Sequence, residues 1–192
     1  MEDIVLIGYG GHAKSVADCI KRQKKYNIVG YTDLKENSCD FKYLGTDKEL
    51  KNIYDSGIKN AAICIGYLGK GDVRQKIYSH LKEIGYNVPV IIDSSAIISD
   101  SSIIQEGTFI GKNVVVNVDT KIGKCCIINT GAIIEHECKI GDFTHISVGA
   151  VLCGQVDIGK ASLVGANATI IQCMHVPDNT IVPAGEVVRR KI

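Results

Sequence analysis

Aliphatic residues recur at every sixth position through the second half of the chain. The series contains only Ile, Leu and Val: Ile92, Ile98, Ile104, Ile110, Val116, Ile122, Ile128, Ile134, Ile140, Ile146, Leu152, Ile158, Val164, Ile170, Val176, Val182 and Val188. Neither the period of an α-helix nor that of a strand keeps such a register over about a hundred residues. A strict period of six is typical of hexapeptide β-helices. The pattern predicts a parallel β-helix with three hexads per coil, so that residues 18 apart stack.

Each hexad also carries a second recurring feature, because its fifth residue is mostly small. These residues are Ser102, Thr108, Val114, Thr120, Cys126, Ala132, Cys138, Thr144, Ala150, Val156, Ser162 and Ala168, with departures at Met174 and Glu186. Glycine follows the aliphatic residue at Gly111, Gly123, Gly141, Gly159 and Gly165. One large and one small inward side chain per hexad indicate a narrow prism, at whose corners we expect these glycines to relax the backbone.

The part before residue 92 has a different pattern, in which short apolar runs alternate with amphipathic segments. The runs predict strands at 3–8, 28–31, 60–66 and 87–92, and the amphipathic segments predict helices at 13–24 and 72–84. Alternating strands and helices indicate a small parallel, Rossmann-like sheet. We therefore expect an α/β domain over residues 1–91 and an all-β domain of hexapeptide repeats over residues 92–192.

Composition and charge narrow the function classes. The chain has 192 residues and a formal net charge of +1, and it has no Lys/Arg-rich run of the kind that binds nucleic acid. No apolar stretch has the length of a membrane span, and the run Ile4–Ile7 is too short for a signal peptide. The eight cysteines form no CxxC pair, so we expect reduced thiols in a cytoplasmic protein. Cys126 and Cys138 fall on the small position and are expected to be core residues.

A glycine-rich loop connects the first predicted strand to the first predicted helix. The segment Gly8–Ala13 fits the form GxGxxG/A, and Asp33 ends the next strand region. Glycines let a phosphate approach the backbone, and a helix N-terminus donates N–H groups to an anion. His12 could reach a phosphate or a sugar. The alternative is a tight turn without ligand. Because the α/β part has half the length of a dinucleotide domain, a nucleotide-sugar suits it better than a nicotinamide cofactor.

The second candidate cluster is Glu135–His136–Glu137. His136 comes two residues after the inward Ile134, so its side chain should face outward. A histidine beside carboxylates can act as a general base, with one carboxylate fixing its tautomer. Gly154, 18 residues later, should lie one coil above His136 and leave room and a backbone N–H beside the imidazole. The alternative is a solvated corner without function.

Two further polar residues belong to this region. Asn129 begins the NTG corner and adds a polar group at a nearby height, and His145 follows nine residues after His136. Zinc-binding relatives of this architecture, the gamma-class carbonic anhydrases, use a close histidine pair with a third histidine upstream. Here His175 lies downstream instead, so we expect no metal.

Three segments together resemble a known family. They are GYGGHAKSV near the start, IG at residue 66, and NTGAIIEHECKIGDFTHISVGAVLCGQVDIG from Asn129 onward. The chain resembles the sialic acid O-acetyltransferase and UDP-N-acetylbacillosamine N-acetyltransferase family over essentially its whole length. The resemblance implies a left-handed β-helix and a homotrimer with active sites between subunits. It also implies acetyl-CoA bound between adjacent β-helices and a nucleotide-sugar held by the α/β domain.

The same resemblance implies roles for single residues. His136 matches the catalytic base and Glu137 its carboxylate partner. Those implied to bind acetyl-CoA are His145, Gly154, Ala184 and Gly185, with the Gly154 N–H at the thioester carbonyl. Those implied to bind the acceptor substrate are Gly10, Gly11, His12, Asp33, Gly66 and Asn129.

The function expected from sequence and resemblance is acetyl-CoA-dependent N-acetylation of a UDP-linked amino-sugar, in the synthesis of bacterial surface glycans or glycoprotein sugars. One alternative is O-acetylation of a sugar of the sialic acid type. Two other classes stay open: a nicotinamide oxidoreductase and a trimeric binding module without catalysis. We expect neither a nucleic-acid partner nor membrane insertion.

Overall fold

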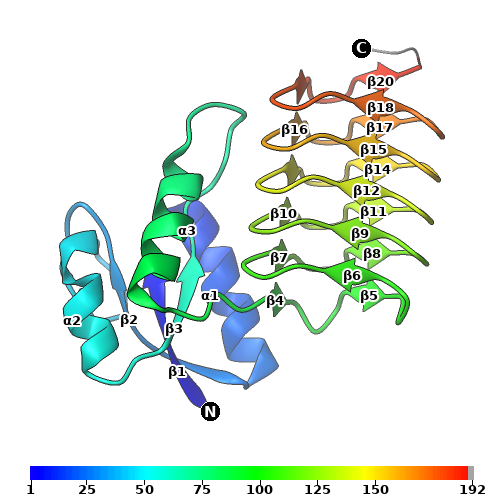
Figure 1. The fold of residues 1–192 in the computed structure, drawn as a ribbon. Coiled ribbons are helices and arrows are strands. Elements are labelled where there is room, and N and C mark those ends of the chain that lie inside the picture. The colour runs from blue at the N-terminus through cyan, green and yellow to red at the C-terminus, as the bar shows by residue number, and fades with distance from the viewer. Residues whose placement is uncertain (190–192) are drawn as a thin grey trace.

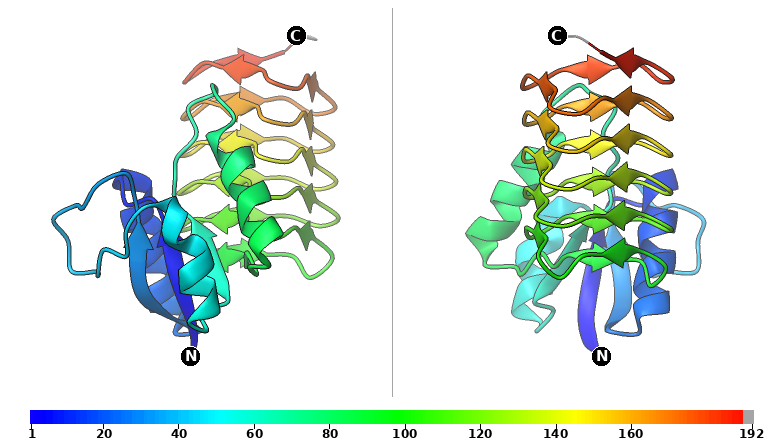
Figure 2. Two further views of the ribbon diagram at one scale, coloured as in Figure 1. Left: turned by 60° about the vertical axis from the view of Figure 1, so that its left-hand side comes forward. Right: turned by 90° about the vertical axis from the view of Figure 1, so that its right-hand side faces the viewer.

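The computed structural model describes residues 1–189 of the 192-residue chain. Two parts lie side by side: an α/β part formed by the first residues and a straight column formed by the rest (Figure 1). Turned views show the helices and the small sheet beside one side of the column (Figure 2). Residues 190–192, the end of the range predicted for the β-helix, lie outside the described residues.

The α/β part is a three-stranded parallel sheet with helices on both faces. In chain order its elements are β1 (Glu2–Ile7), α1 (Gly11–Gln23), β2 (Tyr26–Thr32), the 3₁₀ turn η1 (Asp47–Glu49), α2 (Leu50–Asp55), β3 (Asn60–Ile63) and α3 (Val73–Ile84). The strand order is β2-β1-β3. The last four residues of β1 are fully buried, as expected of a central strand covered on both faces. The predicted parallel sheet is therefore confirmed.

The prediction of a fourth sheet strand at 87–92 is wrong. Asn87 forms only an isolated bridge with Asn60, and β4 (Ile91–Ile92) pairs with β7 of the column instead. An apolar run cannot tell which of two neighbouring sheets will take it, because both bury it equally well. The expected boundary after residue 91 falls inside β4, and helix α2 was not predicted.

The column consists of two-residue strands that form three parallel sheets. The first sheet holds β4, β7 (Phe109–Ile110), β10 (Ile127–Ile128), β13 (His145–Ile146), β16 (Leu163–Val164) and β19 (Ile181–Val182). The second holds β5 (Ile97–Ile98), β8 (Val115–Val116), β11 (Ile133–Ile134), β14 (Val151–Leu152), β17 (Thr169–Ile170) and β20 (Val187–Val188). The third holds β6 (Ile103–Ile104), β9 (Lys121–Ile122), β12 (Lys139–Ile140), β15 (Asp157–Ile158) and β18 (His175–Val176).

The interior of the column follows the sequence pattern. Each strand from β4 to β17 pairs with the strand 18 residues later, as Ile128 does with Ile146, and the aliphatic series from Ile110 to Val188 forms one buried cluster. The small residues, including Cys126 and Cys138, are buried beside it. Burial raises the pKa of the Cys126 thiol to about 12 and that of Cys138 to about 11, so both act as apolar core residues.

The recurring glycines have a different reason from the one predicted. A Cβ at Gly141 would lie 2.6 Å from the backbone nitrogen of Lys160, one coil further on, and a Cβ at the other four would lie 2.3 to 3.0 Å from an atom of the next coil. The left-handed backbone conformation occurs two residues later in each corner, and there non-glycine residues such as Asn113 and Glu137 adopt it. Glycine is therefore required by close packing of successive corners, and not by a positive φ.

The first residue of each strand points outward, and the three sheets of the column differ in the type of residue at this position. The sheet from β4 to β19 packs against the α/β part, with Phe109 and Ile127 buried there, and we name it the domain face. The sheet from β5 to β20 presents an uncovered aliphatic row, and we name it the aliphatic face. The sheet from β6 to β18 presents mostly lysine, aspartate and histidine, and we name it the charged face. The members of the row on the aliphatic face are Ile97, Val115, Ile133, Val151 and Val187, with Thr169 as its one hydroxyl-bearing member.

Candidate active site

His136 lies at the corner between the aliphatic face and the charged face. It sits in the turn from β11 to β12, and its side chain is 48% exposed, as the outward prediction requires. Its Nδ1 lies 3.1 Å from Oε2 of Glu137. Because a carboxylate accepts only, the bond needs the proton on Nδ1, and Nε2 is then free to accept a proton.

Gly154 lies directly against the imidazole, one coil above. A Cβ on Gly154 would stand 2.4 Å from Nε2 of His136, closer than any side chain allows. Among the described residues, the Gly154 N–H has no hydrogen-bond acceptor, whereas its carbonyl accepts from Cys173. The predicted stacking is therefore present, and it leaves both the imidazole and a backbone donor open to a ligand.

Carboxamides one coil away hold both flanking carboxylates. Gln155 donates from Nε2 to Oε2 of Glu137 at 3.0 Å, and Asn117 donates from Nδ2 to Oε2 of Glu135 at 3.0 Å. The bond from Gln155, and after it the bond from His136, keep the pKa of the Glu137 carboxyl below its usual value. Neither carboxamide was predicted, although each lies 18 residues from its glutamate in the sequence.

His145 lies in a very different environment, at the contact between the domain face and the α/β part. It is 8% exposed, and its Nδ1 donates to the carbonyl of Tyr67 at 2.7 Å. Its Nε2 accepts from Nδ2 of Asn129 at 3.3 Å. Burial lowers the pKa of His145, so the imidazole stays neutral with a defined tautomer. Tyr67 was missed because nothing in the pattern links it to a residue 78 positions away.

Two further buried groups belong to the same contact. His12 stacks edge-on against Phe109 at 5.1 Å, and its Nε2 is buried without a hydrogen-bond partner. Burial, with Arg74 and His145 nearby, lowers the pKa of His12 to about 3. Arg74 is 2% exposed and donates to the carbonyls of Ile65 and Cys125, which ties α3 to the column. Arg74 was not among the residues predicted from the sequence.

The glycine-rich loop forms one end of a cavity in the α/β part. Gly10 caps α1 without a side-chain hydrogen bond, and neither Gly10 nor Gly11 has a neighbour within 4 Å of an added Cβ. Asp33 follows β2 and accepts from the backbone N–H of Tyr9 at 2.9 Å. The cavity measures about 670 Å³, and Gly66 lies behind it, against His12. The residues that line the cavity include Gly10, Asp33, Leu34, Asp47, Ile65 and Val73.

The predicted site residues fall into separate groups within one chain. Asn129 lies at the corner between the domain face and the aliphatic face, whereas His136 lies at the next corner, across the aliphatic face. Ala184 and Gly185 share the corner of Asn129, three coils above it, and so lie apart from Gly154. Their predicted role towards acetyl-CoA stays a prediction. Within residues 1–189, no group of three metal-binding side chains gathers around one point, and no helix is long and apolar enough to cross a membrane.

Comparison with known proteins gives a consistent result. The family described as the PglD N-terminal domain matches residues 3–81. PerB from Caulobacter crescentus, solved in complex with CoA and GDP-perosamine, is 30% identical, with a TM-score of 0.94 over 100% of this chain and 91% of that chain. The acetyltransferase domain of PglB from Neisseria gonorrhoeae is also 30% identical, with a TM-score of 0.92 over 100% of this chain and 93% of that chain. A structure of that domain in complex with acetyl coenzyme A is 27% identical, with a TM-score of 0.85.

The fold and its structural matches define an acyltransferase built on a left-handed β-helix. Within that class, the chain belongs to the family of sugar N-acetyltransferases that includes PerB and the acetyltransferase domain of PglB. The predicted fold class, family and class of enzyme are confirmed.

Proposed function

We propose that the protein transfers the acetyl group of acetyl-CoA to the amino group of a nucleotide-linked amino-sugar. The observation that carries the proposal is the stack of Gly154 on His136, in which an exposed imidazole nitrogen meets a backbone with no side chain. The relatives solved with CoA, acetyl coenzyme A and GDP-perosamine support both substrates.

The chemistry follows from the proton on His136. Its Nδ1–H bond to Glu137 leaves Nε2 as the base that takes a proton from the acceptor amine as the nitrogen attacks the thioester carbonyl. The C–S bond then breaks, and CoA leaves as the thiolate. The N–H of Gly154 supports the oxyanion, a contribution commonly worth about 3 kcal/mol per donor. Because a neutral amine is already a good nucleophile, removal of its proton mainly prevents collapse back to reactants.

The α/β part supports a path for the nucleotide-sugar. The cavity beside Asp33 suits the base and ribose, and the open N-terminus of α1 at Gly10 and Gly11 suits the diphosphate. The sugar would then leave the α/β part on the side of His12, towards His145 on the domain face. In this arrangement Gly66 leaves space beside His12, because a Cβ added there would lie 3.8 Å from the Cβ of His12.

A homotrimer completes the site. The aliphatic face is the uncovered apolar side of the column, with Ile97 68% and Ile133 37% exposed. Packing three such faces around one axis would bring the His136 corner of each copy beside the Asn129 corner of the next. The sugar held by one copy would thus meet the base of its neighbour, and acetyl-CoA would lie between the two columns.

The particular nucleotide we propose is UDP, and the pathway is the synthesis of bacterial surface glycans or glycoprotein sugars. Acetyl-CoA is a cytoplasmic metabolite, and eight free thiols suit that compartment, where we expect the enzyme to act.

The proposal is tested by measuring CoA release with acetyl-CoA and a panel of UDP- and GDP-linked 4-amino-sugars, with sialic acid as the hydroxyl acceptor. We expect turnover with an amino-sugar nucleotide and the fastest rate with a UDP-sugar. Turnover with a GDP-sugar alone would correct the nucleotide. Turnover with sialic acid alone would make the enzyme an O-acetyltransferase. If none of the acceptors in the panel led to release of CoA, the proposal would be contradicted.

A further inference from the structure

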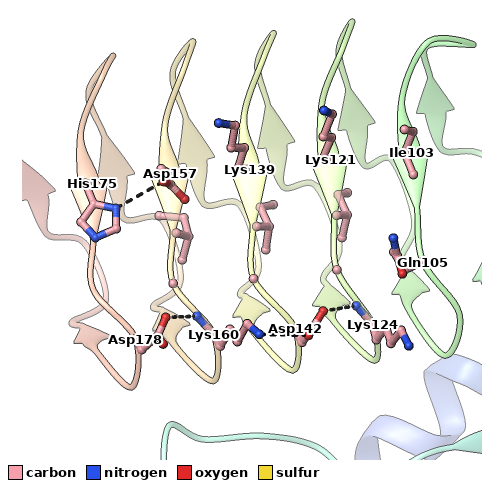
Figure 3. Close-up of a pocket in the computed structure, with 16 residues that line it drawn as sticks. Ile103, Gln105, Lys121, Lys124, Lys139, Asp142, Asp157, Lys160, His175 and Asp178 are labelled. Atoms are coloured by element: carbon pink, nitrogen blue, oxygen red, sulfur yellow. Dashed lines mark hydrogen bonds and ion pairs between the residues drawn. The ribbon is translucent and has the colours of Figure 1, made fainter.

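Two lysines stack without compensation on the charged face. Lys121 and Lys139 are the outward residues of the paired strands β9 and β12, and both are exposed (Figure 3). Like charges directly opposite each other on neighbouring strands are destabilising. Among the described residues, neither ammonium group has an ion-pair partner within 4.0 Å.

The neighbouring corner of the same sheet is arranged in the opposite way. Its row alternates in charge, from Lys124 through Asp142 and Lys160 to Asp178 (Figure 3). Asp142 accepts from the backbone N–H of Lys124 and forms an ion pair with Lys160 at 3.6 Å. Because this row satisfies its own charges, the lysine pair is an exception within the sheet and can bind an anion from outside.

Three acidic residues, Asp119, Glu137 and Asp157, line the same hollow as the lysines, and among the described residues none of them forms an ion pair with either lysine. Asp157, the next outward residue above Lys139, lies 3.5 Å from His175, and Glu137 accepts from Gln155 and His136. The lysines, Glu137 and Gln155 line one hollow of about 710 Å³. The lysine pair therefore shares a hollow with the carboxylate that orients the proposed base.

The height of the pair along the column matches the proposed diphosphate site. Lys121 ends the coil that begins at Phe109, and His12, at the N-terminus of α1, stacks on Phe109. Around an axis parallel to the columns, all copies keep the same height. The charged face beside the His136 corner of one copy would then face the α/β part on the domain face of the next, with the lysines level with its glycine-rich loop.

We propose that Lys121 and Lys139 bind the diphosphate of the nucleotide-sugar that a neighbouring copy carries on its α/β part. The inference rests on the proposed function and on the trimer. In the nucleotide-sugar, a single pyranose ring separates the acceptor amine from the diphosphate. With the amine at His136, this short separation matches the positions of Lys139, on the same coil, and Lys121, on the adjacent coil. In CoA, by contrast, the long pantetheine arm carries the diphosphate much further from the thioester.

The first test is steady-state kinetics of Lys121→Gln and Lys139→Gln, with Lys160→Gln as the matched control on the same sheet. Each of the two variants should raise the KM for the nucleotide-sugar about tenfold, since a charge-assisted hydrogen bond is lost. The KM for acetyl-CoA and kcat should stay within twofold, and Lys160→Gln should behave as wild type. An unchanged KM for the nucleotide-sugar, or a raised KM for acetyl-CoA in its place, would overturn the proposal.

The second test is complementation in mixed trimers of His136→Ala with the double variant Lys121→Gln/Lys139→Gln. If the lysines act in the same site as His136 of their own chain, no site in a mixed trimer contains both His136 and the lysines. The activity of the mixed trimer then stays at the level of the double variant. Recovery of wild-type KM would mean that the lysines act on their own chain's nucleotide, and would refute the inference. An inactive wild type would instead refute the proposed function, so the two failures are distinguishable.

Discussion

Two histidines on neighbouring coils have opposite environments, and this difference supports the separate roles proposed for them. His136 is half exposed and has one nitrogen occupied by Glu137, so the other can exchange a proton with a ligand. His145 is buried with both nitrogens bonded, to Tyr67 and Asn129, and burial lowers its pKa. The exposed histidine suits proton transfer, whereas the buried one suits a fixed acceptor at the domain contact.

At the residue scale, His136→Ala should lower kcat by about a hundredfold, because a positioned general base commonly contributes that much. The KM for acetyl-CoA should change little. His175→Ala is the matched control, since His175 is also exposed and lies 3.5 Å from a carboxylate, Asp157, on the charged face. Near wild-type turnover of the His136 variant, or an equal loss in the His175 variant, would remove His136 as the base.

The corner is the element that the column repeats, and its geometry is the same with or without a function. From Gly107 to Gly185, one residue of each corner has a positive φ, as Glu137 does beside His136 and as Asn113 does far from it. Positive φ at Glu137 therefore carries no special strain for catalysis. What distinguishes the corner of His136 is its stacking partner, because Gly154 meets an imidazole, whereas Gly141 meets backbone.

At the element scale, Gly141→Ala should destabilise the column, because its Cβ would lie 2.6 Å from the backbone nitrogen of Lys160 and the corner cannot move without its neighbours. Overpacking of this kind typically costs about 1–3 kcal/mol. Urea unfolding measures the loss. Lys160→Ala, a change to an exposed side chain in the abutting corner, should cost much less; equal midpoints for the two variants would contradict the packing explanation.

At the scale of the whole molecule, each of the three faces of the column has a different partner. The domain face packs against the chain's own α/β part, the aliphatic face is proposed to pack against other copies, and the charged face is proposed to receive part of a neighbour's substrate. This distribution separates His136 from Asn129 within a chain. Activity should therefore depend on assembly.

At the scale of the assembly, Ile133→Lys should prevent trimer formation and abolish activity, because it would bury a charge in each copy of the aliphatic face. Analytical ultracentrifugation measures the change in mass. Ile103→Lys is the control, since Ile103 is 52% exposed on the charged face. A monomeric wild type, or a trimer that tolerates Ile133→Lys, would contradict the proposed interface.

The contact between the two parts should also respond to acid. The pKa of His12 is about 3 in the folded chain against 6.5 for an ordinary histidine, so the unfolded chain binds the proton first as pH falls. Stability present above pH 6.5 is therefore lost progressively towards pH 3, by about 2 kcal/mol at pH 5. His12→Asn should flatten the pH dependence of the urea midpoint; an unchanged slope would mean that other groups cause it.

Much of the site could be predicted because a regular repeat converts sequence distance into spatial distance. The spacing of 18 residues placed Gly154 on His136, and the same spacing would have given Gln155 and Asn117. Tyr67 and Arg74 could not be predicted in this way, since they reach the column from the α/β part, where no period relates sequence to position.

By itself, the sequence determined the column, its core and the vertical alignment of His136, because only one arrangement buries an aliphatic residue at every sixth position. It also determined the parallel sheet and the glycine-rich loop. Only the tertiary structure decided which face the α/β part covers, why the glycines are needed, and that Asn129 and His136 stand at different corners. The physical reason is that a period fixes contacts along the column, whereas contacts between faces and domains depend on side chains that no period relates.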